Sequence, residues 1–290
     1  MLNIPPNILD EEFWKGFDGP FFGFQHVQLL NRHTTEILSC REHYGLWLKE
    51  KGLSEEDLAR YFNDQFIGRW ELPRELHPSV FVAEKSRDFL VEHKEKRGEK
   101  PFFMWMSFQD PHNPHVVCEP YDTLVDPMEV VYKKYIEGEF DNKPPIYQEL
   151  YDKGMGKIHF NDGIGVPCAS PAKPEKEDTW RKSIAIHHGM VKLMDEEIGQ
   201  VINYLKEIGL YDNTIIIFTS DHGDYLGNHG FRGKGFPAFE EAYNVPFVVK
   251  NTENYNMGKR SSAIIGNLDI APTILDLIGI SIPSAMDGIS

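Results

Sequence analysis

The chain has too few cysteines for a disulfide framework and too little positive charge for a nucleic-acid partner. Its 290 residues contain three cysteines, Cys40, Cys118 and Cys168, which lie far apart, form no C-x-x-C pair and so fit neither paired bridges nor a zinc site. The 30 basic residues are outnumbered by 45 acidic ones, and the formal net charge is -15. Because phosphate backbones are bound by basic surface, this balance argues against nucleic acid as the partner.

Long apolar runs and a targeting pattern are also missing. No stretch is long enough to span a bilayer, and the amino terminus lacks the basic-then-apolar pattern of a signal peptide. The sequence therefore leaves the compartment open, periplasmic or secreted on one side and cytoplasmic on the other, and it leaves the oligomeric state open. The hydrophobic fraction of 41% is typical of a globular protein, and the length allows one large α/β domain or two smaller ones.

Hydrophobic periodicity divides the chain into an irregular start, a long excursion and alternating helices and strands. Residues 1–45 are rich in aromatics and glycine without a period, and 116–176 form a polar, proline-bearing excursion or small insertion. Amphipathic spacing predicts helices at 54–62, 78–96 and 178–208, and a last helix that begins after Asn267 or Asp269 and ends before Gly279. Apolar β-favouring runs predict strands at 102–108, 214–220 and 245–250.

The run at 214–220 ends directly in a group of polar side chains. Four or five β-favouring residues in a row predict a strand covered on both faces, as in the middle of a parallel sheet. Ligands bind at the carboxyl ends of such strands, and here Asp221 and His222 follow at once, with Lys234 thirteen residues after Asp221. An Asp beside a His suits a divalent cation, and the lysine suits an anion held beside it.

Several strings, in this order and spacing, resemble the sulfatase family of the alkaline-phosphatase superfamily. The strings are PHNP at 111–114, MDEEIG at 194–199, GLYDNT at 209–214, TSDHGDYLGNHG at 219–230 with Lys234, the EE and VP pairs within 240–246, and DIAPTIL at 269–275. The resemblance covers most of the chain from about residue 78 onward. It implies one α/β domain over residues 1–290, with an alkaline-phosphatase-like mixed, mostly parallel sheet flanked by helices and incomplete at both ends.

The resemblance also implies roles for particular side chains. Asp221 and His222 match the second half of the divalent metal site, which is usually calcium; many members have Asn in place of His222, so another divalent metal is the alternative. Lys234 matches the lysine that contacts the sulfate group, and His112 the histidine that reaches its ester oxygen. His115 and His229 are the candidates to line the substrate pocket. The implied substrate is an aryl or carbohydrate sulfate ester.

Other interpretations of the same residues stay open. An Asp-His-Gly turn after a strand is by itself more often a hydrogen-bonded turn than a metal site, and Lys234 by itself reads as a solvated loop lysine. Phosphonate monoester and phosphodiester hydrolases of the same superfamily share the metal site, lysine and histidine, so phosphoryl transfer is the alternative reaction. A non-catalytic module that binds sulfate is a hypothesis of a different class.

The catalytic nucleophile of the family is not found in this sequence. Sulfatases convert the first residue of a C/S-x-P/A-x-R string to formylglycine, and none of the three cysteines is followed by an arginine at the required place. The Asp pair that supplies the other metal ligands is also not found. We therefore expect a fragment whose formylglycine and first metal ligands belong to a missing amino-terminal part, and whose carboxyl end stops before a smaller subdomain.

A turnover assay tests this expectation. We expect the purified chain not to hydrolyse an activated aryl sulfate in the presence of calcium, because it holds half a metal site and no nucleophile. Turnover that is abolished by Lys234→Ala or Asp221→Ala would contradict it.

Overall fold

A computed structural model of the chain describes residues 9–96, 100–159, 165–172, 176–252 and 258–290. The helices are α1 (Glu11–Gly16), α2 (Glu42–Glu50), α3 (Glu55–Tyr61), α4 (Pro78–Lys96), α5 (Ile146–Lys153), α6 (Glu177–Glu207), α7 (Glu240–Tyr243) and α8 (Ile270–Leu277). The strands are β1 (Ile67–Arg69), β2 (His115–Val117), β3 (Lys157–His159), β4 (Gly165–Pro167), β5 (Ser170–Pro171), β6 (Ile216–Thr219), β7 (Phe231–Arg232) and β8 (Phe247–Lys250). None of the helices in these ranges combines the length and apolar character needed to cross a bilayer.

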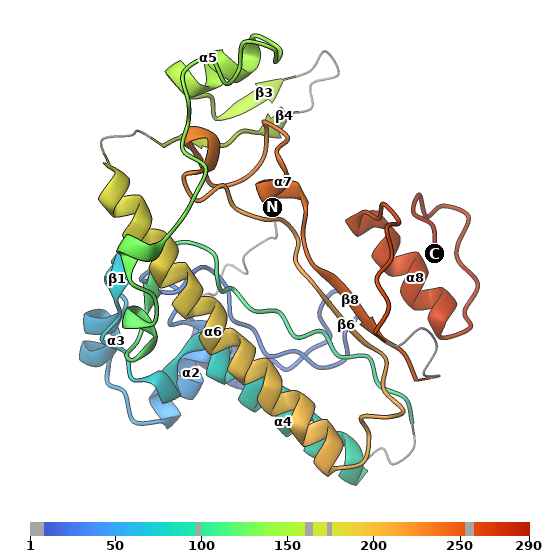
Figure 1. The fold of residues 1–290 in the computed structure, drawn as a ribbon. Helices are drawn as coiled ribbons and strands as arrows, with labels where there is room; N and C mark the ends of the chain where they lie inside the picture. The colour runs from blue at the N-terminus through green and yellow to red at the C-terminus, as the bar shows by residue number, and fades with distance from the viewer. Residues whose placement is uncertain (1–8, 97–99, 160–164, 173–175, 253–257) are drawn as a thin grey trace.

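The fold is built around the long helix α6, and α4 packs along it (Figure 1). Its apolar stripe places Val201 and Leu205 in a buried cluster with Ala83 and Leu90 of α4. Both helices were predicted from periodicity, and both are confirmed, α4 with the predicted bounds. The predicted helix at the carboxyl end is likewise confirmed as α8.

Local capping explains the short helices of the first half. Ser54 caps α3, and its hydroxyl and the Asp57 carboxylate satisfy each other's backbone N–H groups in a capping box, as the predicted N-cap requires. The stretch predicted as irregular, 1–45, contains α1 and the start of α2 in its described part; α1 is capped by the Asp10 carboxylate, which accepts from the backbone N–H of Phe13. Around these helices an aromatic core forms, which includes Tyr44, Trp47, Phe62, Trp70 and Phe81.

The strands pair two by two within the described ranges, and this differs from the sheet expected at 214–220. Strand β6 pairs antiparallel with β8, in register from Ile216 opposite Lys250 to Thr219 opposite Phe247, whereas β1 and β2 are the parallel pair. Phe218 and Val248 remain 39% and 58% exposed, so the β6–β8 ribbon is not covered on both faces. The expected burial on both faces is therefore wrong for the described part of the chain, because a two-stranded ribbon leaves one face to solvent.

The strand predicted at 102–108 is an extended segment without ladder partners among the described residues. Its side chains alternate: Met104 and Met106 pack into the cluster of α4, α6 and Ile216, while Phe103 and Trp105 face solvent. The predicted period-2 alternation of side chains is thus observed. Within these ranges, however, no neighbouring strand pairs with the segment to make it part of a sheet.

The excursion at 116–176 is packed rather than loose. It carries α5 and the β3–β4 ribbon, which lie together at one end of the molecule (Figure 1). Phe140 and Leu150 of this segment share a buried cluster with Tyr225 and Phe231 from the loop after β6. The excursion therefore supports the loop that carries the predicted site.

Candidate functional site

The loop that follows β6 is fixed by its own backbone contacts. Gly223 N–H donates to the Ala242 carbonyl at 2.9 Å, and a Cβ at position 223 would lie 2.0 Å from the Glu241 carbonyl oxygen, so only glycine allows this approach. Farther along, Asp224 Oδ1 accepts from the backbone N–H groups of Leu226 and Gly233 at 2.8 and 3.2 Å. These contacts fold the loop back so that Lys234 returns to the end of β6.

A second loop brings His112 to the same place. His112 lies in the turn between the extended segment 101–109 and β2, and its N–H donates to the Gln109 carbonyl at 3.0 Å. The Lys234 ammonium lies 2.7 Å from His222 Nε2 and 3.5 Å from His112 Nε2. His222 Nε2 is also 3.3 Å from Asp221 Oδ2. The structure therefore gathers Asp221, His222, His112 and Lys234, although His112 and Lys234 are 122 residues apart in the sequence.

The hydrogen bonds assign the tautomers of the two imidazoles. Nδ1 of His222 lies 2.7 Å from the Gly223 carbonyl oxygen, and Nδ1 of His112 lies 2.6 Å from the Asn113 carbonyl oxygen. Because a carbonyl oxygen only accepts, each Nδ1 carries the proton and each Nε2 presents a lone pair toward Lys234. Burial lowers the pKa of His112, which favours this neutral form.

This donor set fits one side of a divalent metal site. The lone pair of His222 Nε2 and the Asp221 carboxylate converge, and the Gly223 carbonyl oxygen at Nδ1 fixes the His222 ring, as carbonyl groups bound to the other ring nitrogen of metal-binding histidines do. The Lys234 ammonium lies 2.7 Å from the same His222 nitrogen. Within the described ranges no three His, Cys, Asp or Glu side chains converge in a group that could hold a metal ion.

The two further histidines expected at the pocket contact other residues. His115, on β2, is buried, with Nδ1 2.5 Å from Ser183 Oγ of α6 and its ring 5.7 Å from that of His187. His229 stacks on Phe239, and its two ring nitrogens lie against the carboxylates of Glu139 and Glu241. Among the described residues neither histidine is in hydrogen-bonding contact with Lys234. Their assignment to the substrate pocket stays a prediction.

No sequence pattern points to His33, whose ring stacks on His112 with 3.7 Å between centroids. It lies in an aperiodic stretch that was interpreted as irregular structure. Burial and the charges of His112 and Lys234 lower the pKa of His33 to about 4.

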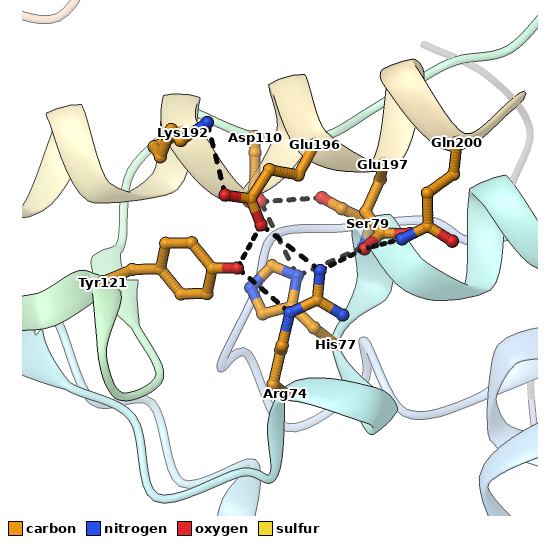
Figure 2. Close-up of polar contacts among 9 residues, drawn as sticks. All are labelled: Arg74, His77, Ser79, Asp110, Tyr121, Lys192, Glu196, Glu197 and Gln200. Atoms are coloured by element: carbon orange, nitrogen blue, oxygen red, sulfur yellow. Dashed lines mark hydrogen bonds and ion pairs between the residues drawn. The ribbon is translucent and has the colours of Figure 1, made fainter. Parts of the chain in front are cut away.

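The Asp110 carboxyl group, two residues before His112, is buried at the start of the His112 turn. Asp110 Oδ2 accepts from Ser79 Oγ, in the first turn of α4, at 2.8 Å and lies 3.8 Å from Nδ1 of His77, the residue before that helix (Figure 2). Asp110 Oδ1 has no hydrogen-bond partner among the described residues. Burial raises the pKa of Asp110 to about 7 from an ordinary value of 3.8, so the carboxyl group takes up a proton readily in the folded state.

We expect Asp110→Asn to stabilise the chain more at pH 8 than at pH 5. The raised pKa means that Asp110 contributes stability below about pH 3.8 and loses it as the pH rises through about 7, whereas asparagine stays neutral. The stabilisation by Asp110→Asn should be larger at pH 8 than at pH 5 by more than about 1 kcal/mol, the equivalent of one pKa unit. In Tm this difference corresponds to roughly 2–4 °C. Asp88→Asn, at an exposed carboxylate on α4, is the control. A Tm difference from wild type that does not change with pH would contradict the prediction.

Comparison with known proteins identifies the family to which the chain is similar. A family model described as Sulfatase matches residues 15–280. The chain is 30% identical over 263 residues to an arylsulfatase of Clostridium perfringens, covering 89% of this chain and 50% of that protein. Over 100 residues it is 45% identical to an N-acetylglucosamine-6-O-sulfatase of Bacteroides thetaiotaomicron, covering 34% of this chain and 18% of that protein. The chain thus spans about half the length, or less, of these curated relatives.

A solved structure supports the fold independently. The phosphonate monoester hydrolase of Agrobacterium radiobacter superposes with a TM-score of 0.74 at 24% identity, covering 100% of this chain and 55% of that chain. The alkaline-phosphatase-like mixed fold expected from the sequence is therefore confirmed.

Proposed function

Because this chain belongs to the sulfatase family, we propose that its converging side chains form the anion-binding side of a sulfuric ester hydrolase site. The observation that carries the proposal is the position of the Lys234 ammonium, between His222 Nε2 at 2.7 Å and His112 Nε2 at 3.5 Å. An aryl or carbohydrate sulfate is the proposed substrate class, and the arylsulfatase and N-acetylglucosamine-6-O-sulfatase relatives support it. The chain covers half or less of these relatives, so the activity of a whole enzyme is part of the proposal.

Each residue has a distinct task in this site. The Lys234 ammonium donates to the non-bridging oxygens of the ester and stabilises the negative charge that develops on them. His112, neutral with the proton on Nδ1, donates to the departing ester oxygen from Nε2 only after it takes up a second proton there. A bound anion favours that uptake, because its charge opposes the burial that lowers the pKa of His112.

The proposed cofactors are a divalent metal, with calcium first, and a formylglycine outside the residues of this chain. Members of the family generally use both. Asp221 and His222 would hold the metal, which supplies Lewis-acid polarisation of the ester when bound. A carboxylate suits calcium, whereas imidazole is more usual for softer cations, so calcium and zinc titrations of the chain separate the alternatives.

Binding of inorganic sulfate, measured by isothermal titration calorimetry, tests the proposed site. We expect Lys234→Ala to weaken binding by about 10- to 100-fold, because a charge-assisted hydrogen bond contributes about 1.5–3 kcal/mol. Lys153→Ala, which removes an exposed lysine on α5, is the matched control and should bind as wild type does. Equal affinity of wild type and Lys234→Ala would contradict the site.

The alternative reaction gives a different result in the same measurement. A phosphonate monoester or phosphodiester hydrolase shares the fold, as the Agrobacterium structure illustrates. Tighter binding of phenylphosphonate than of phenyl sulfate by wild type, lost in Lys234→Ala, would favour phosphoryl transfer. Sulfate binding that persists without turnover, once an amino-terminal part carrying the nucleophile is present, would favour a binding module.

A further inference from the structure

The imidazole of His33 lies flat on that of His112. The ring centroids are 3.7 Å apart and the planes differ by 10°, which is a parallel stack. His112 has two further polar contacts, a hydrogen bond from Nδ1 to the Asn113 carbonyl oxygen at 2.6 Å and a long contact between Nε2 and the Lys234 ammonium at 3.5 Å. Contacts at the two ring nitrogens leave the ring free to rock about the axis that joins them, and a flat neighbour restricts that freedom. The stack therefore helps to fix the orientation of the His112 ring.

The loop that carries His33 is anchored on both sides. Asn31 Nδ2 donates to the Glu42 carboxylate at 2.8 Å, and the Thr35 hydroxyl donates to the Gln65 carbonyl at 2.5 Å. Gln109 Nε2 donates to the Leu30 carbonyl at 3.3 Å and so ties this loop to the segment that leads into the His112 turn. Thr35 and Glu42 are buried, so these anchors are shielded from water.

The backbone on both sides of His33 is strained, and the hydrogen bonds that anchor the loop hold it in this conformation. Arg32 and Thr34, the two neighbours of His33, have φ angles of 68° and 32°, in the left-handed region that non-glycine residues rarely occupy. Such conformations cost about 1–3 kcal/mol each and persist only where the surroundings enforce them. Both strained residues flank His33, the side chain that stacks on His112.

We propose that His33 is a positioning residue, which holds the ring of His112 so that Nε2 faces Lys234 and a bound anion. The inference rests on the proposed function for the anion, but the geometry of the two rings can be tested without one. The face of the ring performs this task, since His33 Nδ1 is buried and has no hydrogen-bond partner among the described residues. The lowered pKa of His33 keeps its ring neutral at pH 7, so it stacks on His112 without repulsion between charges.

Histidine NMR tests the stack itself. With His112 resonances assigned through His112→Gln, we expect His33→Ala to move its carbon-bound ring protons downfield, because the shielding of the stacked ring is lost. His33→Phe keeps a flat ring and should keep the shielded shifts. His33→Gln, polar but without an aromatic ring, should behave like alanine and serves in its place if the alanine variant does not fold. Unchanged His112 shifts in the alanine or glutamine variant would overturn the proposal.

Sulfate titration of the same variants tests the consequence. We expect His33→Ala to bind inorganic sulfate about two- to tenfold more weakly than wild type, the equivalent of an aromatic pair, and His33→Phe to bind it as wild type does. Equal loss in the phenylalanine and alanine variants would overturn the positioning role, since the nitrogens would then be the groups that act. If wild type does not bind sulfate, the proposed function fails, while the NMR comparison still decides whether His33 orients His112.

Discussion

Gly189→Ala is expected to lower the free energy of unfolding by about 3 kcal/mol or more, a large effect for one added methyl group. Gly189 lies in the middle of α6, where the main chain at Tyr121 lies against the helix. A Cβ at this position would lie 2.2 Å from the Tyr121 carbonyl oxygen and 3.2 Å from Val117 Cγ1. Backbone cannot move aside as a side chain does, so the helix and the β2 region would have to separate. Urea denaturation followed by circular dichroism measures the change.

The same helix offers a matched control in Gly199. Apart from the backbone of α6 itself and the two adjacent residues, no atom of the described residues lies within 4 Å of a Cβ placed at this position, and glycine inside a helix costs about 0.5–1 kcal/mol relative to alanine. Gly199→Ala should therefore stabilise the chain by about that amount. If the two substitutions shift stability in the same direction, the close approach of Tyr121 to α6 is not the cause of the effect at Gly189.

Arg74→Ala is expected to cost about 3 kcal/mol, the lower end of the range for breaking a buried ion pair, since a third of the arginine side chain is exposed. Arg74 Nη2 lies 2.6 Å from Glu197 Oε1, and its Nε donates to the Tyr121 hydroxyl at 3.0 Å (Figure 2). The Glu197 side chain is only 1% exposed. Removing Arg74 therefore leaves a buried carboxylate without its cation, and burial already raises the pKa of that group.

Two comparisons make this test specific. Lys192→Ala removes an exposed ion pair with Glu196 of the same network and should cost no more than about 0.5 kcal/mol. The double variant Arg74→Met with Glu197→Leu, which removes both charges, should recover most of the lost stability. Additive losses in the double variant would show that Arg74 acts through packing rather than through the charge of Glu197.

Elements defined by neighbouring residues were predictable, and elements defined by remote partners were not. The apolar stripe of α6 and the capping residues of α3 lie within a few turns of chain, so the sequence alone locates both helices. The strand at 102–108 shows its period but not its pairing, because hydrogen-bond partners come from elsewhere in the chain. For the same reason burial on both faces was wrongly expected for β6, whose described neighbour is β8 alone.

The residues of the candidate site show the same difference between local and remote contacts. Asp221, His222 and Lys234 belong to one loop, so their joint position follows from a single motif, and family resemblance added His112. His33 could not be predicted, because its position depends on anchors that join it to Gln65 and Gln109 and on strain that no sequence pattern encodes.

The half-buried segment at 101–109 has a consequence for the behaviour of the chain in solution. Its backbone has no ladder partners within the described ranges, and it shows Phe103 and Trp105 to solvent, as an open sheet edge that invites pairing with a second chain does. The net charge of -15 opposes such contacts through repulsion between like molecules. Because the screening length falls to about 3 Å in 1 M salt, ionic strength decides whether repulsion or edge pairing prevails. We therefore expect the net negative charge to limit self-association through this segment at low ionic strength.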